Sequence, residues 1–335
     1  MDMQFLDAAQ VEALLDYPLL IETMKRDLGS AGIAVPLRSS HVMHVDATGA
    51  DTLLTMPAWN EGGTLGVKLV TVRGSSRKRT GATVNAVYLL FDPDTGAPVA
   101  CLDGEALTRR RTAAISALAA SLLARPDAAH LLMVGTGTLA SDIVQAHCAV
   151  RSFNRVSIWG RNRDAAQDKA DALRKLGIET HVARDLERAV GEADIVCCAT
   201  TAREPVVVGR WLRSGQHLDL TGGFRPDMRE VDEEAIVRSE LFVDTRDGAL
   251  VEAGEIVQAI ANGSIAATHI AGTLAELCRG SHPGRSGRDA ITVFKSVGTA
   301  AADLVAGTLA LRRTSGPGAT FGQIGCHEAT GIDFG

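Results

Sequence analysis

The feature that most constrains the fold is a glycine turn at residues 135–140, with the sequence GTGTLA. It follows the apolar run LLMV and precedes a helix-like segment, so it joins a strand to a helix. In the pattern GxGxxA the first glycine allows a tight turn, the second lets a pyrophosphate approach the backbone, and the alanine permits close helix packing. The free amides at the start of such a helix attract phosphate. We therefore expect a dinucleotide-binding unit with cofactor contacts at Gly135, Thr136, Gly137, Thr138 and Leu139.

Strand-like and helix-like segments alternate from this turn to about residue 280. Alternation of this kind predicts a parallel sheet that is covered by helices on both faces. The strand-like runs are LLMVG, VSIWG, IETHV, DIVCCAT, HLDLTG and LFVDT.

The first part of the chain has a different pattern. Residues 9–29 have the spacing of one amphipathic helix, and five runs rich in β-branched residues follow, separated by turn signals such as DATGAD and DPDTGAP. Evenly spaced runs of this kind predict an antiparallel sheet. Two further helices are expected at residues 105–124 and 289–312. The prediction is an α/β fold in which a Rossmann-type domain, residues 117–284, is inserted into a mixed α+β domain, residues 1–116 and 285–335.

Composition and charge exclude several classes of protein. The net charge is −6 without a long block of one sign, which argues against a nucleic-acid-binding protein. The first residues do not resemble a signal peptide, and no apolar run is long enough to cross a bilayer. The six cysteines form no CxxC pair, so we expect reduced thiols, a cytoplasmic location and no metal site.

The residues after the second strand bear on the choice of cofactor. Sites that prefer NAD usually place an acid there for the ribose hydroxyl, but this chain has Arg161, Asn162 and Arg163. A guanidinium pairs well with a 2′-phosphate, so we expect NADPH to be preferred, with NADH possible as a weaker cofactor. The alternative is a basic turn that only faces solvent.

Two cations of the first domain lie on core-facing positions. Strand alternation puts Lys68 on the same side as Val70, and helical spacing puts Arg111 on the apolar side of its helix, whereas Arg109 and Arg110 are expected to face outward. A buried cation needs a partner, which is either an internal acid or an anionic ligand. Two inward cations favour a site for a carboxylate.

Several motifs in this order resemble the ornithine cyclodeaminase/mu-crystallin family across roughly residues 30–310. The resemblance implies a Rossmann domain beside a substrate-binding and dimerisation domain, a homodimer, and nicotinamide-dependent chemistry at the carbon of an amino or imino acid. It also implies that Arg38, Lys68 and Arg111 bind the substrate carboxylate, that Met56 and Thr83 line the same pocket, that Thr112 touches the cofactor phosphates, and that Thr200 and Val297 lie near the nicotinamide. The motifs are GVKLVTV, DPDTGAPVACLDG, LTRRRTAAISALAA, the glycine turn, TGGFRPDMREVD and ITVFKSVGTAAADL.

One position departs from the cyclodeaminases, which carry a catalytic aspartate directly after the glycine pair. Here Phe224 follows Gly222-Gly223, and the nearest acid is Asp227. Ring closure with loss of ammonia needs a group that handles protons, which a phenyl ring cannot do. Asp227 either takes that role or, with Glu230 three residues later, only begins a helix.

Within the family, the details of this chain resemble the branch that reduces Δ1-pyrroline-2-carboxylate to L-proline and, in some members, Δ1-piperideine-2-carboxylate to L-pipecolate. In such a reduction Lys68 either supplies a proton or pairs with the carboxylate. The alternatives are cyclodeamination of ornithine, reductive amination as in alanine dehydrogenases, and a protein without enzymatic activity that binds a small ligand.

Overall fold

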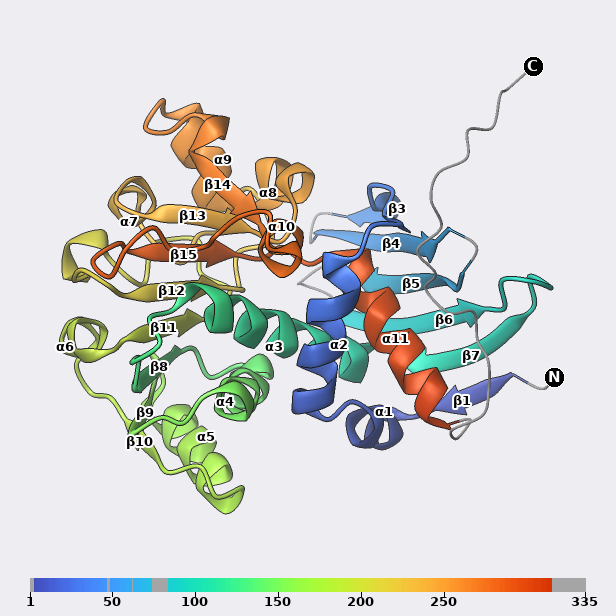
Figure 1. Ribbon diagram of the computed structural model, residues 1–335, viewed down its shortest axis with the longest axis horizontal. Coiled ribbons are helices and arrows are strands. Elements are labelled where there is room, and N and C mark those ends of the chain that lie inside the picture. The colour runs from blue at the N-terminus through green and yellow to red at the C-terminus, as the bar shows by residue number, and fades with distance from the viewer. Residues whose placement is uncertain (1–2, 47–48, 62, 74–83, 315–335) are drawn as a thin grey trace.

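A computed structural model describes residues 3–46, 49–61, 63–73 and 84–314. The chain forms two sheets, one on each side of the molecule, and the long helix α3 (Gly104–Leu123) leads from one to the other (Figure 1). The expected helix at residues 105–124 is therefore confirmed. Within the described ranges, no helix combines the length and apolar character that crossing a membrane requires.

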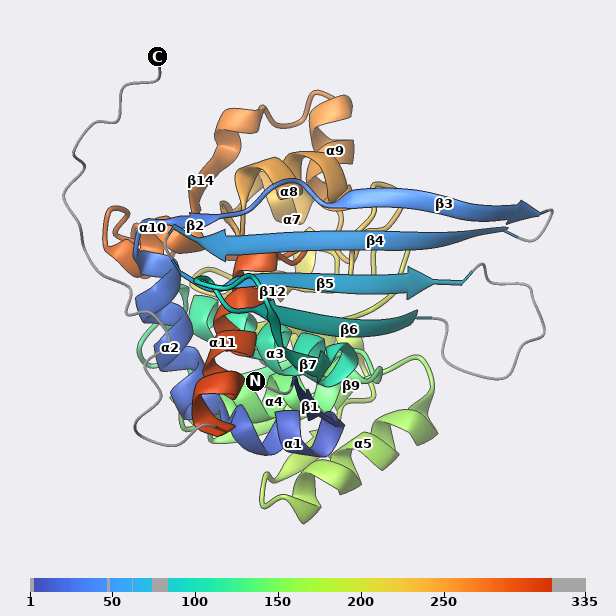
Figure 2. The same ribbon diagram turned by 90° about the vertical axis from the view of Figure 1, so that its right-hand side faces the viewer.

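The first sheet contains all five strands that the sequence predicts in this region, paired antiparallel with their neighbours. Two short strands add to it, β1 in parallel with β7 and β2 antiparallel to β4, and the sequence analysis missed both. The strands β3 and β4 extend well beyond the helices (Figure 2). Their bounds are β1 Gln4–Leu6, β2 Ile33–Ala34, β3 Ser39–Asp46, β4 Gly49–Asn60, β5 Leu65–Val72, β6 Val84–Phe91 and β7 Pro98–Asp103.

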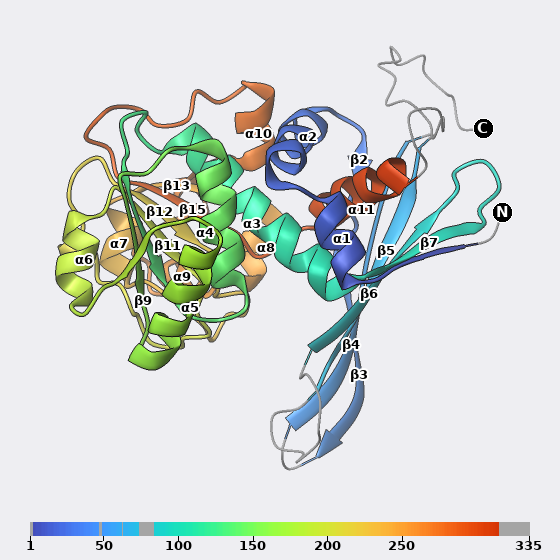
Figure 3. The same ribbon diagram turned by 90° about the horizontal axis from the view of Figure 1, so that it is seen from below.

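Helices cover only one side of this sheet. Figure 3 shows α1 (Ala8–Leu14), α2 (Tyr17–Gly29) and α11 (Ala300–Thr314) on that side, while the other side carries no helix among the described residues. The single helix expected at residues 9–29 is wrong. Asp16 caps a new helix by accepting a hydrogen bond from the Leu19 amide at 3.2 Å, and Pro18 occupies its first turn, where a missing N–H costs nothing.

The second sheet is parallel throughout, in the order β10-β9-β8-β11-β12-β15-β13-β14. This confirms the predicted fold class, an α/β fold with a Rossmann-like parallel sheet beside a second sheet. The bounds are β8 His130–Val134, β9 Arg155–Trp159, β10 Thr180–Val182, β11 Ile195–Cys198, β12 His217–Leu220, β13 Glu240–Val243, β14 Ile270–Thr273 and β15 Thr292–Lys295.

Alternate residues of the parallel strands enter two different cores, as expected for a sheet covered on both faces. Cys197 packs in the core that also contains α3, whereas its neighbour Cys198 packs in the core on the opposite face. The first core continues into the helices of the antiparallel sheet. On the face of the parallel sheet that carries the first core, the helices are α4 Leu139–Val150, α5 Arg163–Lys175 and α10 Leu274–Arg279. On the opposite face they are α6 Leu186–Glu192, α7 Glu233–Val237, α8 Arg246–Glu252 and α9 Gly254–Ala261.

The last helix begins later than the sequence analysis predicted. Residues 292–295, which were expected within a helix at 289–312, form β15, and all four are buried. Strand β15 pairs with β12 and β13, so this part of the segment assigned to the first domain lies in the parallel sheet. A short apolar run that is buried on both faces of a sheet cannot be distinguished from a helix by its periodicity.

Candidate active site

Two buried cations share one buried carboxylate where α3 and α11 pack against β5. The Nζ atom of Lys68 lies 2.7 Å from Oδ2 of Asp303, and Nε of Arg111 donates to Oδ1 of the same side chain at 2.9 Å. The Asp303 side chain has 0% exposure and the two cations 4% and 7%. Of the two partners that the sequence left open, the internal acid is therefore present, and the sequence analysis had not found it.

The charges of this group do not cancel. Burial lowers the pKa of Lys68 to about 8, even though Asp303 opposes that shift. Burial also acts to raise the pKa of Asp303, but Arg111 and Lys68 hold it below its usual value. With both cations protonated, the three side chains carry one net positive charge, and among the described residues the terminal nitrogens of Arg111 have no hydrogen-bond partner.

Arg38 reaches across from the first domain to the second. Its Nη2 donates to the carbonyl oxygens of Val297 at 3.3 Å and Gly298 at 3.2 Å, and it lies 2.7 Å from Oε2 of Glu252 in α8. Arg38 also contributes to the lowered pKa of Lys68, so its charge lies close to the first group. Gly298 links Arg38 to the group, because its carbonyl binds Arg38 and a Cβ on it would lie 3.1 Å from the terminal nitrogens of Arg111. That Arg38, Lys68 and Arg111 bind a substrate carboxylate stays a prediction.

The loop after β15 closes this site from the parallel sheet. Asp244 accepts hydrogen bonds from Ser296 Oγ at 3.0 Å and from the amides of Val297 at 3.0 Å and Gly298 at 2.7 Å. Gly298 has φ +88°, and a Cβ there would lie 3.1 Å from both terminal nitrogens of Arg111. Only glycine adopts this left-handed backbone without strain, and its missing Cβ leaves room for the guanidinium.

Three other predicted residues have simpler placements. Met56 is 5% exposed and pairs with Lys68 across β4 and β5, so it lies on the same face. Thr112 is buried in α3, next to Arg111. Thr83 lies outside the described residues, so its predicted role in the pocket stays a prediction.

The glycine turn has the geometry that a pyrophosphate requires. Gly135 has φ +125°, and a Cβ there would lie 2.5 Å from the carbonyl oxygen of Ala199. A Cβ at Gly137 would meet no atom within 4 Å, so this backbone faces open space at the start of α4. Thr138 precedes that helix without a side-chain capping bond, which leaves amides available to an anion. The turn therefore fits a dinucleotide, and contacts of Gly135, Thr136, Gly137, Thr138 and Leu139 with it stay predictions.

The basic turn after β9 lies beside the glycine turn. A Cβ at Gly160 would lie 2.5 Å from Cγ2 of Thr136, so the two turns are in direct contact. Arg161, Asn162 and Arg163 are all exposed. Asn162 Oδ1 also caps α5, accepting from the amides of Asp164 at 3.0 Å and Ala165 at 3.2 Å. Arg161 and Arg163 make no ion pair with the described part of the chain.

Asp227 does not join the buried charged group. Its carboxylate is 44% exposed and binds Arg225 at 2.9 and 2.8 Å and Arg203 at 3.5 Å, in the loops after β12 and β11. No helix begins at Asp227 either, so the capping-box alternative is wrong. Glu230 instead binds Thr200, the residue expected near the nicotinamide. Phe224 is 48% exposed.

Arg109 and Arg110 do not face outward as predicted. Arg109 binds Glu12, and the guanidinium of Arg110 lies 3.6 Å over the Tyr17 ring. Both arginines therefore lie in the contact of α3 with α1 and α2.

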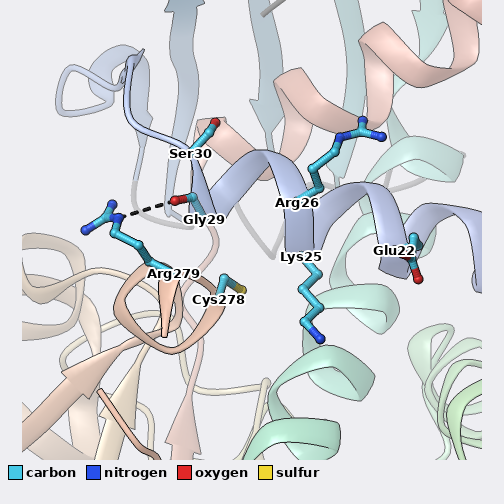
Figure 4. Close-up of a pocket in the computed structure, with 7 residues that line it drawn as sticks. All are labelled: Glu22, Lys25, Arg26, Gly29, Ser30, Cys278 and Arg279. Carbon is cyan, nitrogen blue, oxygen red and sulfur yellow. Dashed lines mark hydrogen bonds between the residues drawn. The ribbon is translucent and has the colours of Figure 1, made fainter. Parts of the chain in front are cut away.

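A separate open cavity of about 460 Å³ lies between the ends of α2 and α10 (Figure 4). Arg279 Nε donates to the Gly29 carbonyl at 3.2 Å beside it. The cavity shares no residue with the groups above, and we assign no substrate to it. Its lining residues are Glu22, Lys25, Arg26, Gly29, Ser30, Cys278 and Arg279.

A glycine turn at the carboxyl end of a central parallel strand, beside a second sheet that supplies buried cationic side chains, defines a two-domain dinucleotide-binding protein of the α/β class. The chain belongs to the ornithine cyclodeaminase/mu-crystallin family, whose profile matches residues 1–316.

Named relatives agree with this assignment. A Δ1-pyrroline-2-carboxylate reductase of Paracoccus denitrificans is 43% identical over 266 residues, covering 79% of this chain and 84% of the relative. The solved Δ1-pyrroline-2-carboxylate reductase of Thermococcus litoralis, in complex with NADH and L-proline, is 35% identical with a TM-score of 0.87, covering 93% of this chain and 98% of that one. An archaeal alanine dehydrogenase dimer with bound NAD is 26% identical with a TM-score of 0.86, covering 94% and 97%.

Proposed function

We propose that this protein uses NAD(P)H to reduce a cyclic imino acid, Δ1-pyrroline-2-carboxylate to L-proline, and that the same pocket accepts Δ1-piperideine-2-carboxylate to give L-pipecolate. The observation that carries the proposal is the unbalanced positive charge of Lys68, Arg111 and Asp303. One buried excess cation matches one substrate carboxylate. Relatives named for this reaction support the choice of substrate.

In this account Arg111 presents its terminal nitrogens to the carboxylate, and Lys68 contributes the second positive charge. Asp303 holds both cations in place, while Arg38 reaches from the first domain to the carbonyl oxygens of Val297 and Gly298 in the second. A reduced nicotinamide cofactor held at the glycine turn would supply the hydride for the imine carbon. The contribution of the chain is to orient the ring of the substrate and to exclude water around it.

The reduction makes few demands on proton transfer, because a cyclic imine can bind already protonated at nitrogen. Lys68 holds a proton on Nζ at neutral pH, since its pKa is about 8, and it can return a proton to the site when the product forms. Cyclodeamination would need an acid at Phe224, or in its place a free Asp227. The Asp227 carboxylate is bound to arginines instead, which argues against that alternative.

For the cofactor we propose a preference for NADPH over NADH. Arg161 is exposed beside the glycine turn and is the main candidate to bind a 2′-phosphate, with Asn162 and Arg163 assisting. The Thermococcus litoralis enzyme was solved with NADH, so the preference rests on the basic turn of this chain.

We further propose that the active form is a homodimer and that the helix-free side of the first sheet is its interface. Strand alternation places Leu65 and Val87 on the side opposite Lys68, and these two residues are 37% and 40% exposed. An uncovered apolar sheet face of this kind is typical of an interface between subunits. A Val87→Lys variant should sediment as a monomer in analytical ultracentrifugation if this assignment is correct.

The experiment that tests the proposed reaction follows the absorbance of reduced nicotinamide with each cyclic imine in the absence of ammonia, then with pyruvate plus ammonia. A separate incubation offers ornithine without added reductant. The proposal expects oxidation with the cyclic imines alone. Activity only with ammonia would favour reductive amination, and proline from ornithine would favour cyclodeamination.

A further inference from the structure

Glu230 joins the two loops that follow β11 and β12. Its Oε1 accepts hydrogen bonds from the amide of Thr200 at 2.6 Å and from Thr200 Oγ1 at 2.9 Å, and its Oε2 accepts from the amide of Gly222 at 2.6 Å. The residue is 0% exposed. Burial raises the pKa of Glu230, and the hydrogen bonds from Thr200 and Gly222 oppose that shift because they stabilise the charged carboxylate. The three donors fix both loops to the same point.

A second buried acid and a lysine lie directly behind Glu230. Glu255 Oε1 accepts from the Glu230 amide at 2.7 Å, and Glu255 Oε2 lies 3.2 Å from Nζ of Lys295 at the end of β15. Glu255 is 3% exposed and Lys295 is 0% exposed. A Cβ at Gly223 would lie 3.0 Å from Glu255 Oε1 and 3.1 Å from Lys295 Nζ, so these side chains support the Gly222-Gly223 turn.

This group is an inefficient way to stabilise a core. Burying charged side chains carries a desolvation penalty that their mutual attraction barely offsets, and apolar replacements are often as stable. The group instead fixes the ends of three neighbouring strands, β11, β12 and β15, relative to one another. Thr200 also borders the glycine turn, since a Cβ at Gly135 would lie 3.4 Å from its Cγ2.

We propose that Glu230 is a positioning residue for the half of the cofactor that carries the nicotinamide. Its hydrogen bonds fix Thr200 and Gly222 beside the nicotinamide half, on the side of the glycine turn that faces away from β9. The adenosine half lies at the other side, where the turn after β9 is located, and does not depend on Glu230. The inference rests on the proposed function only in requiring a nicotinamide dinucleotide, and it does not depend on the identity of the imine.

The test is calorimetric titration of the Glu230→Gln variant with two probes, NADPH and 2′-phospho-ADP-ribose, which lacks the nicotinamide. The glutamine oxygen still accepts from Thr200, but its amide group opposes the N–H of Gly222. Loss of a buried hydrogen bond to a charged group predicts an increase of about tenfold or more in the Kd of NADPH. The Kd of the fragment should stay within about twofold of the parent value, since its contacts are elsewhere.

Hydrogen exchange in the cofactor-free chain gives a second readout, because the amides of Thr200 and Gly222 should exchange faster in Glu230→Gln. The matched control is Asp219→Asn, which replaces another fully buried carboxyl, in β12, that binds Ser116 and neither loop. If Glu230→Gln does not fold, Thr200→Val removes the hydroxyl bond alone and should produce a smaller increase in the same direction.

Equal weakening of NADPH and the fragment would overturn the inference, because it would show a general structural effect. Unchanged binding of both probes, with the amides as protected as in the parent, would overturn it too. Both results are independent of activity, so a chain that binds as expected but reduces no imine would contradict the proposed function and leave this inference intact.

Discussion

Asp303 of α11 lies 2.7 Å from Lys68 of β5 through Oδ2 and also accepts from Arg111 of α3 through Oδ1, so one carboxylate organises both cations of the proposed substrate pocket. The three residues come from positions 68, 111 and 303, and their meeting depends on the packing of α3 and α11 on one face of the sheet. The account therefore assigns the carboxylate-binding charge to a group rather than to any single residue.

Replacing Asp303 with asparagine should destabilise the fold and impair substrate binding. It leaves two buried cations without a counter-charge, which for a buried pair typically costs about 3 to 5 kcal/mol. Urea denaturation of the cofactor-free chain measures the loss. The exposed Asp247→Asn is the control and should change stability by less than about 0.5 kcal/mol. Equal stability of both variants would contradict a structural role for the Asp303 charge.

The activity should decline as the pH rises through the pKa of Lys68. Burial lowers that pKa to about 8, so the ammonium loses its proton above this pH and the group loses its net positive charge. Far above it, kcat/KM should fall about tenfold per pH unit. The Lys68→Arg variant stays charged, so its alkaline decline should move to higher pH even if its maximum is lower. An identical alkaline limb in both enzymes would assign the titration to another group.

Arg161→Ala should change the choice of cofactor. Loss of a guanidinium that binds a 2′-phosphate predicts an increase of about tenfold or more in the Kd of NADPH, with the Kd of NADH nearly unchanged. Lys175→Ala, at the far end of α5, removes a positive charge outside the basic turn and serves as control. The assignment fails if the ratio of the two dissociation constants stays the same in Arg161→Ala.

A second buried carboxyl makes the stability of the chain depend on pH. Asp219 binds Ser116 in a cluster where the Nε2 of His147 lies 3.0 Å from Ser116 Oγ and 3.3 Å from Cys197 Sγ. Burial raises the pKa of Asp219 to about 7, and burial lowers the pKa of His147 to about 3. The folded state therefore favours a protonated Asp219.

The sign of this dependence follows from the raised pKa. A carboxyl that holds its proton more tightly when folded adds stability at low pH, and the contribution is lost as the pH rises from about 4 to about 7. Asp219→Asn removes this titration. Between pH 5 and pH 8, the free energy of unfolding of the parent should therefore fall relative to that of the variant by more than about 2 kcal/mol. Thermal unfolding at both pH values measures this, and a constant difference would show that Asp219 does not titrate there.

The sequence predicted the parts of the molecule whose signals are local. The glycine turn, the alternating segments after it and the five runs of the first sheet all have short-range patterns, and all appear in the fold. Lys68 and Arg111 were identified from the sequence because a charged residue at an apolar position of a strand or helix stands out in the local pattern. Asp303 has the same signal, an acid among the alanines of α11, and the same argument applied to that helix would have found it.

Other residues carried no such signal. Glu230 stands three residues after Asp227, which is the spacing of a capping box, and only the fold shows that it reaches Thr200 and Gly222. Residues 292–295 were predicted as helix because a strand buried on both faces lacks the alternation that identifies strands. Asp16 and Pro18 are local signals for the start of a new helix, and the prediction of a single helix at residues 9–29 did not use them.

The measurement that tests the central claim most directly is the transfer of a labelled hydride. The chain is incubated with Δ1-pyrroline-2-carboxylate and NADPH deuterated at both transferable positions, and the proline formed is analysed by mass spectrometry. Reduction of the imine predicts L-proline with one deuterium on the α-carbon. Proline without deuterium, or no proline from the imine alongside proline and ammonia from ornithine, would contradict the account.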